Sequence, residues 1–447
     1  MTTDAQGLTI TAASDAAAAA YDDVVGAYLR YRADAGQRLK ALLDQDGEMP
    51  MAQVLKGAFA MLAYNQAMVP RARDAAAAAA RLAGTDREAA HAAALGFWAD
   101  GEMDRALGAW EAIMAAHPHD ILAFRLHHFC AFWLGRAGQM LRAVDAVGPR
   151  WSAAIPGYGS ILACCCFANE ECGNYQVAEE AGRAAVALDP ADLWATHGVA
   201  HVLEMQGRRG EGIAWLKALE AHWDGGSNLL HHLWWHRAMY HLERGEHAEV
   251  LALYDGGFRN LQSPLTQAMP DLYIDVQNAA SMLFRLQRHG VDVGDRWVEL
   301  ADKAEARIGD CLSTFTLPHW MMALAATGRF QAAARMLDAM REAANRPGTI
   351  APILREAAIP VCEAVLAHAQ GDHARAVAAM RPALGVMHRM GGSHAQQDVL
   401  EQLFLDAAMK ADAQEDARML LERVAGRHPV APERRVGYAE AARRVRH

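Results

Sequence analysis

The sequence predicts an all-α protein in which pairs of helices stack into a solenoid, and three observations lead to this prediction. Alanine dominates the composition, 53% of the 447 residues are hydrophobic, and long runs of β-branched residues are scarce, as expected of helices. A chain of this length exceeds one compact core, so several domains or a repeat array are expected. One pattern built on glycine and alanine also recurs along the chain, with a spacing of 34 residues from Gly101 to Gly135 and from Gly173 to Gly207.

Several recurring segments read as an apolar helix, a glycine, a polar turn and a second helix with alanine five positions after the glycine. Glycine permits the left-handed conformation that ends the first helix, and the small residue allows the two helices to cross closely. The 34-residue period matches the tetratricopeptide repeat, whose helix pairs must stack to bury their apolar faces. We therefore predict a tetratricopeptide-like α-solenoid, a right-handed superhelix of helix pairs. The glycines of the pattern are Gly101, Gly135, Gly173, Gly207, Gly245, Gly328 and Gly371.

The pattern divides the chain into three expected segments. Residues 1–86 are helical in composition but lack the pattern, and they are expected to form an N-terminal helical cap. Residues 87–258 carry the regular repeats. Residues 259–447 mix irregular and regular helical repeats that close the array, because 83 residues separate Gly245 from Gly328.

The distribution of charge and the number of cysteines restrict the expected binding partners and the expected cellular compartment. The net charge of −10 is spread along the chain, and only a short tail near the C-terminus is basic, so no nucleic-acid partner is expected. No run of 18 uncharged apolar residues is present, which predicts no membrane span. Seven cysteines without framework spacing favour reduced thiols and a cytoplasmic protein. Homo-oligomer formation is left open.

Histidine, tryptophan and glutamate gather at the positions that line the concave groove in tetratricopeptide repeats. Helical periodicity puts these positions on one face of the first helix of each pair. A concave surface with aromatic walls and a few polar groups is the expected place for a ligand. The candidate ligand-binding residues are Trp194, His197, His232, Trp235, Glu170 and Phe167.

The same face offers candidates for catalysis. Histidine suits proton transfer near neutral pH, so His201 or His236 is the candidate general base and Glu204 the residue that orients a histidine. His197 and His201 are four residues apart and are candidate ligands of a divalent metal ion, although the stretch "HVLEM" is not the H-E-x-x-H arrangement. The other interpretation is structural: histidines on packed helices often bond only to their neighbours.

The stretch "MGGSHAQQD", residues 390–398, predicts a break at the two glycines and a helix capped by Ser393. His394 and Asp398 then share one helix face. They form either a solvated pair at the start of a helix or, if the array curls far enough, an acid–base pair in the same groove as the other histidines.

Several blocks resemble the tetratricopeptide repeat protein 38 family: "HVLEMQGR", "WWHRAMYHLERGEHAEVLALYD", "NAASMLFRL", "MALAATGR" and "GGSHAQQDVLEQL". The resemblance covers most of the chain and implies that the histidine-bearing and Gly-Gly-Ser-His blocks belong to one scaffold. It implies no reaction. This chain departs from the family in having Gln397 where arginine is usual.

The sequence therefore predicts a solenoid whose groove binds a small molecule or peptide. The alternative is an enzyme that uses groove histidines for acid–base or metal-assisted hydrolysis or elimination on a small organic substrate. Phosphoryl transfer is disfavoured, because no phosphate-binding loop, dinucleotide fingerprint or nucleophile elbow is present.

Overall fold

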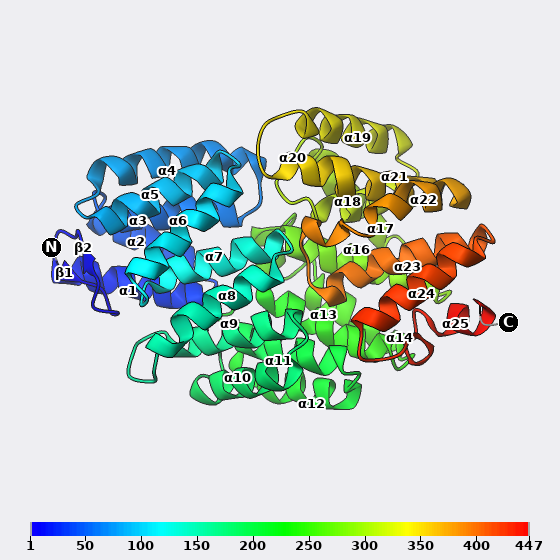
Figure 1. The fold of residues 1–447 in the computed structure, drawn as a ribbon, viewed down its shortest axis with the longest axis horizontal. Helices are drawn as coiled ribbons and strands as arrows, with labels where there is room; N and C mark the ends of the chain where they lie inside the picture. The colour runs from blue at the N-terminus through cyan, green and yellow to red at the C-terminus, as the bar shows by residue number, and fades with distance from the viewer. Residues whose placement is uncertain (1, 446–447) are drawn as a thin grey trace. The chain divides into compact units, whose positions relative to one another are not determined.

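The computed structural model describes residues 2–445, and the fold is all-α as predicted (Figure 1). The strands of the described chain form one short antiparallel hairpin, β1 (Thr2–Thr3) with β2 (Thr9–Ile10), in which Thr2 lies opposite Ile10. Everything else that is regular is helical, and most of the helices follow one another as antiparallel pairs.

The helices of the first half are α1 (Asp15–Leu29), α2 (Ala35–Gln45), α3 (Pro50–Leu62), α4 (Val69–Leu82), α5 (Asp86–Ala99), α6 (Met103–Ala116), α7 (Ile121–Trp133), α8 (Ala137–Val147), α9 (Tyr158–Glu171), α10 (Tyr175–Leu188), α11 (Leu193–Met205) and α12 (Arg209–Leu219). Those of the second half are α13 (Leu229–Leu242), α14 (His247–Leu253), α15 (Pro264–Ala268), α16 (Tyr273–Arg288), α17 (Arg296–Ala306), α18 (Thr316–Ala326), α19 (Phe330–Ala344), α20 (Ile350–Ile353), α21 (Ile359–Ala369), α22 (His373–Met380), α23 (His394–Lys410), α24 (Gln414–Arg427) and α25 (Ala439–Val445). Short 3-10 turns are η1 (Gln66–Met68), η2 (Gly148–Arg150), η3 (Glu220–His222), η6 (Arg381–Ala383), η7 (Met387–Met390) and η8 (Pro432–Arg434), and η4 (Tyr254–Phe258) and η5 (Leu354–Ala358) are π-helical.

The glycine pattern has the structural meaning predicted for it. All seven pattern glycines have positive φ, from 65° at Gly135 to 81° at Gly173. After Gly207, the N–H of Arg208 donates to the carbonyl of Leu203 at 2.8 Å. This bond closes the last turn of α11 in the left-handed termination that glycine adopts at little cost.

The small residue five positions after the glycine is buried at the helix crossing. Ala106, Ala178 and Ala333 are fully buried. In α12 this place belongs to Gly212, where even a Cβ atom would lie 2.3 Å from Cζ of Tyr240 on α13. The ring of Tyr240 therefore occupies the space that an alanine side chain at this position would need.

Residues 1–86 contain helix pairs that the glycine pattern does not reveal. Tyr31, between α1 and α2, has φ 53°, and Tyr64, which precedes α4, has φ 45°. Asp412, between α23 and α24, has φ 55°. These residues end a helix in the same way as the glycines, at a cost of about 1–2 kcal/mol for a left-handed non-glycine residue. The expectation that this segment caps the array stays a prediction.

The chain divides into two compact units. The first contains the residues up to Phe132, together with Arg136–Val199 and Leu219–Leu229; the second contains Trp133–Gly135, Ala200–Ala218 and the residues from Leu230 on. The three-segment division expected from the repeat pattern, 1–86, 87–258 and 259–447, stays a prediction.

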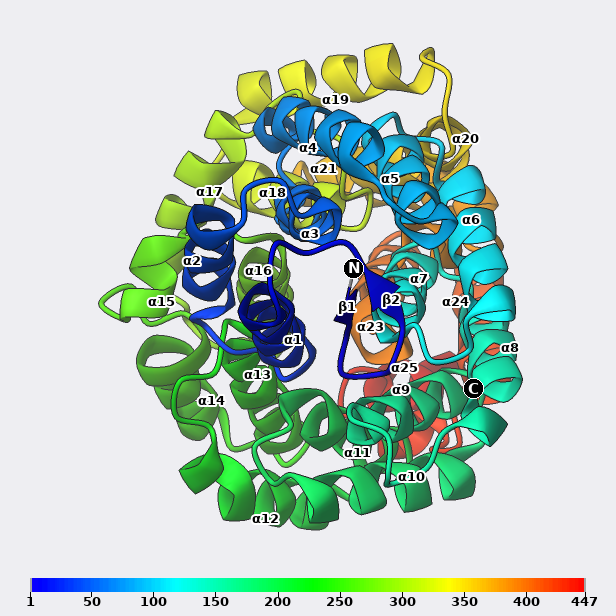
Figure 2. The same cartoon turned by 90° about the vertical axis from the view of Figure 1, so that its left-hand side faces the viewer.

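Within each unit, successive helices pack side by side. In the first unit α4 packs against both α3 and α5 (Figure 2), and α9 packs against α8 and α10. In the second unit α16 packs against α18 and α23, and α18 also contacts α21. This stacking is the architecture of a tetratricopeptide-like helical repeat protein.

Two further expectations can be compared with the described residues. All seven cysteines are free thiols, as predicted. Among residues 2–445, no helix combines the length and apolar character needed to cross a membrane.

Candidate functional site

Three histidine rings meet in the interior of the second unit, and we refer to His201, His232 and His236 as the histidine cluster. His201 lies on α11, and His232 and His236 lie one turn apart on α13. The ring centroid of His236 is 4.4 Å from that of His201 and 4.7 Å from that of His232. All three side chains are buried, the most exposed at 2%.

Oxygen atoms fix the orientation of the two α13 rings. Nδ1 of His232 lies 2.8 Å from Oδ1 of Asn278 on α16, and Nδ1 of His236 lies 2.6 Å from Oε2 of Glu204 on α11. The amide oxygen of Asn278 can only accept, so Nδ1 of His232 carries the proton, and Nδ1 of His236 carries one when Glu204 is ionised. In both rings it is Nδ1 that an oxygen orients.

Polar side chains on one face of α16 form hydrogen bonds with side chains of α13. Asp275 pairs with His231 at 2.9 Å, and Ser281 accepts from the indole N–H of Trp235 at 3.2 Å. The Trp235 ring stacks on that of His232, with centroids 5.0 Å apart. Trp235, a candidate ligand-binding residue, thus forms a wall of the cluster.

Burial sets the protonation of this site. It lowers the pKa of His201 and His232 well below the usual range, helped by the neighbouring histidines, and lowers the pKa of His236 to about 3. Burial also raises the pKa of Glu204 to about 8. The three rings are therefore neutral at pH 7, and a neutral imidazole is the form that binds a metal ion.

The arrangement satisfies the spacing of a metal site. His201, His232 and His236 each offer a nitrogen within 4.8 Å of the others. In a tetrahedral zinc site, Zn–N bonds of about 2.0–2.1 Å place ligand nitrogens about 3.3 Å apart. Small rotations of the side chains would close this difference.

The segment that begins with the two glycines reaches the same site. Gly391 and Gly392 have φ 88° and 79°, and Ser393 caps α23 with a capping box to Gln396, as predicted. The charge of His394 acts on His201, and the charges of Arg285 and Asp398 act on Glu204. All five candidate catalytic residues, namely His201, Glu204, His236, His394 and Asp398, therefore lie in one region of the second unit.

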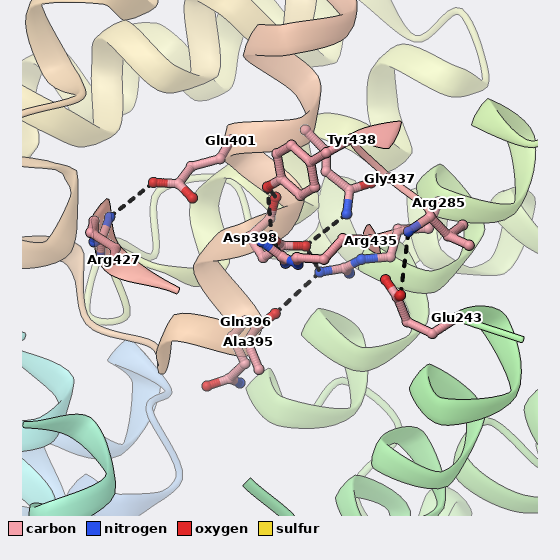
Figure 3. Close-up of polar contacts among 12 residues, drawn as sticks. Glu243, Arg285, Ala395, Gln396, Asp398, Glu401, Arg427, Arg435, Gly437 and Tyr438 are labelled. Atoms are coloured by element: carbon pink, nitrogen blue, oxygen red, sulfur yellow. Dashed lines mark hydrogen bonds and ion pairs between the residues drawn. The ribbon is translucent and has the colours of Figure 1, made fainter. Parts of the chain in front are cut away.

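Asp398 is the centre of a buried ionic network (Figure 3). It accepts hydrogen bonds from Arg435 and from Tyr438 Oη, the latter at 2.6 Å, and Arg285 lies 3.5 Å from its other oxygen. Gln402, one turn along α23, donates to that oxygen at 2.7 Å. Burial alone would raise the pKa of Asp398, but the two guanidinium groups hold it well below the usual range.

The expected pairing of His394 with Asp398 is wrong. The partners of Asp398 are the two arginines, the tyrosine and Gln402, and the carboxylate stays ionised, so it neither orients His394 nor exchanges protons near pH 7. A solvated pair is also wrong, because Asp398 is buried. Gln397 stands where the resembled family has arginine, and its side-chain amide donates to the carbonyls of Gly391 and Gly392 at 3.1 and 2.8 Å.

The remaining candidates lie in the first unit. The rings of Phe167 and Trp194 have centroids 4.7 Å apart, and that of His197 stacks on Trp194 at 4.7 Å. Glu170 is fully buried on α9. None of these side chains is more than 8% exposed, so they do not face an open channel as the groove prediction assumed.

Sequence reasoning missed several residues of the site, among them Asn278, Arg285, Arg435 and Tyr438. A signal for the first two was present, because Asn278, Ser281 and Arg285 recur at helical spacing in an otherwise apolar segment. Arg435 and Tyr438 lie in the basic tail, and nothing in its sequence indicates that it folds back to contact α23.

No family model matches the chain. Solved structures with similar folds include a monomeric mutant of IFIT1 with Gppp-AAAA, which is 11% identical over 97% of this chain and 96% of that one, with a TM-score of 0.41. Another is the Naa15/Naa10 complex bound to HypK-THB, 14% identical over 91% of this chain and 68% of that one, with a TM-score of 0.26. Neither likeness indicates a ligand, and the fold class rests on the helix pairs of the chain itself.

Proposed function

We propose that this helical repeat protein binds a divalent transition-metal ion at the histidine cluster, and that the ion holds a small organic molecule. The observation that carries the proposal is that His201, His232 and His236 each offer a ring nitrogen within 4.8 Å of the others, while an oxygen holds Nδ1 of His232 and of His236. Histidine ligands of metal ions usually donate their other N–H to a carboxylate or carbonyl oxygen, which fixes the ring and strengthens it as a ligand.

The choice of metal follows from the ligand type. Imidazole nitrogen suits zinc, iron, copper and nickel, whereas magnesium and calcium require oxygen ligands. Three histidines of the second unit leave at least one coordination position for a water or a substrate atom, as in catalytic zinc sites. The other metal ligand expected from the sequence, His197, stays a prediction.

Metal-assisted hydrolysis is the second candidate function. It is favoured by the carboxylate of Glu204, which lies 2.6 Å from the ring of His236. A divalent ion bound there would lower the pKa of a water to about 7, and its charge would also lower the pKa of Glu204 from about 8, so that the ionised carboxylate could receive the proton. The chain offers no alternative nucleophile motif.

The proposal also includes the family and the kind of ligand predicted from the sequence. Membership in the tetratricopeptide repeat protein 38 family is supported by the sequence blocks quoted above. A small molecule fits a buried site better than a peptide does, because the histidines are at most 2% exposed. The absence of nucleic-acid partners and the cytoplasmic location stay predictions.

The test is metal content and metal titration of untagged protein purified without chelators. We expect about one equivalent of a transition metal per chain, and after its removal we expect bound Co²⁺ to show the strong visible bands of low-coordinate nitrogen sites. His232→Ala and His236→Ala should abolish binding, whereas His222→Ala, at an exposed position, should leave it unchanged.

Asn278→Ala removes the oxygen partner of His232 and keeps every ligand, so it should weaken the metal 10–100-fold. If the wild-type protein holds no metal and Co²⁺ shows no saturable binding, the proposal fails. Hydrolysis is tested separately, by the turnover of small esters and amides with and without the metal. Metal binding without turnover leaves the binding function and excludes the enzymatic one for those substrates.

A further inference from the structure

A second buried polar group lies in the first unit, around a guanidinium that has no counter-charge. Arg125 on α7 is 2% exposed, and within residues 2–445 no carboxylate lies at ion-pair distance from it. Its Nη2 donates to the hydroxyl of Tyr31, and its Nη1 has no hydrogen-bond partner in the described chain. A buried charge without a partner costs several kcal/mol.

Aromatic rings hold this guanidinium in place. Its Cζ lies 4.7 Å from the ring centroid of Trp194 and 5.3 Å from that of Tyr31. Such cation–π contacts are worth about 0.5–2 kcal/mol each, less than the cost of leaving the charge unpaired. The stacking fixes the plane of the guanidinium while Nη1 keeps an N–H to donate.

Two neighbours have polar atoms that are likewise unused within the described part of the chain. His128, one turn after Arg125 on α7, is fully buried, and neither of its ring nitrogens has a hydrogen-bond partner. The buried hydroxyl of Tyr28 has none either, and the charge of Arg125 acts on it. More than nine in ten buried polar groups in proteins are hydrogen-bonded, so three such residues in one place indicate a missing polar partner.

The acidic side chain whose charge acts on Arg125, Asp192, does not form an ion pair with it. Asp192 uses Oδ1 to cap α11, accepting from the backbone N–H groups of Trp194 and Ala195 at 2.9 Å each. It also lines a cavity of about 300 Å³ together with Asp22 and Asp189, and Arg125, Tyr28, Tyr31 and His128 are not among the residues that line this cavity.

The geometry points to a binding site for the carboxylate of a small organic acid at Arg125, with Tyr31, Tyr28 and His128 as further polar contacts. A guanidinium matches a carboxylate in shape and can donate to both of its oxygens. The site supplies one full positive charge, because His128 is neutral when buried beside Arg125. One charge balances a monocarboxylate, whereas a phosphate dianion would need more.

The experiment is calorimetric titration of the full chain with hexanoate, hexanamide and inorganic phosphate, with melting temperatures as a second readout. Hexanoate should bind saturably and raise the melting temperature, and hexanamide, of the same shape without the charge, should do neither. Arg125→Met should weaken hexanoate at least tenfold, and Arg150→Met, at an exposed position, should leave it unchanged.

Tyr31→Phe and His128→Gln test the site if Arg125→Met does not fold, because both retain the size of the side chain. Tyr31→Phe removes only a hydroxyl and should weaken hexanoate a few-fold. The inference is overturned if hexanoate does not bind, if hexanamide or phosphate binds as well as hexanoate, or if hexanoate binds equally to the wild type and the Arg125 variant.

Discussion

Replacing Asp398 by asparagine tests whether this residue is a structural anchor or a proton donor. The substitution keeps an oxygen that can accept from Tyr438 but removes the charge that faces Arg285 and Arg435. Their side chains are 0% and 9% exposed, so water compensates little. Removing one partner of a buried ion pair costs about 3–5 kcal/mol, and we expect Asp398→Asn to lower the free energy of unfolding by that amount.

The assay is urea unfolding at pH 7, followed by circular dichroism and tryptophan fluorescence. Glu363→Gln is the matched control: its carboxylate pairs with Arg341 at the surface, where such pairs contribute about 0–1 kcal/mol. The arginines lower the pKa of Asp398 in the folded chain, so its contribution is present above the unfolded value of about 3.9. It is lost as the pH falls through the lower folded pKa.

The difference between wild type and Asp398→Asn should therefore be constant from pH 8 to pH 5 and shrink only below about pH 4. An asparagine variant as stable as the wild type at pH 7 would refute the anchor. A difference that changes between pH 6 and pH 8 would instead indicate a carboxyl group that titrates near neutrality, as the acid–base role requires.

Two further substitutions test the packing and electrostatics of α11 to α13. Gly212→Ala should destabilise the protein by about 1–2 kcal/mol, because the new Cβ would lie 2.3 Å from Tyr240; overpacking costs about 1–3 kcal/mol, and alanine recovers up to about 1 kcal/mol of helix propensity. The control, Gly108→Ala, has nothing within 4 Å of its Cβ and should stabilise the protein. Thermal melts that rank the two variants the other way would contradict the close contact of Gly212 with Tyr240. Asp192→Asn should stabilise the protein at pH 8 by at most about 3 kcal/mol, because burial raises the pKa of Asp192 to about 6 and the charged form lowers stability above that pH. The gain in stability should fade as the pH drops below 6. Unfolding curves that show the same gain at pH 8 and at pH 5 would rule out this cause.

The helix pairs could be predicted from sequence wherever glycine ends the first helix, because only glycine adopts the left-handed conformation without strain. The pairs ended by Tyr31, Tyr64 and Asp412 could not, because tertiary packing holds these residues in a conformation that their side chains disfavour. A local sequence pattern reveals the conformational cost of one residue, whereas the packing free energy that offsets this cost comes from contacts with residues far away in the sequence.

The candidate site could likewise be predicted from the sequence only in part. His201, Glu204 and His236 could be placed from helical spacing, which fixes the face on which a side chain lies. The partner of Asp398 could not, because Arg435 is 37 residues away in the sequence and lies in a segment with no repeat pattern. Spacing along one helix suggested His394 instead, but a buried carboxylate is better stabilised by two fixed positive charges than by a neutral imidazole.

The side chains around the histidine cluster come from consecutive structural modules, with α11, α13 and α16 each contributing its own face. Each module can change its contribution by a point substitution without refolding its neighbours, because stability in repeat arrays is a sum over units and their interfaces. The ligand donors, their oxygen partners and the nearby arginine can therefore be varied one module at a time. Duplicating or deleting one whole helix pair between them, by contrast, would move α11, α13 and α16 out of contact with one another, and the site would be lost in a single step.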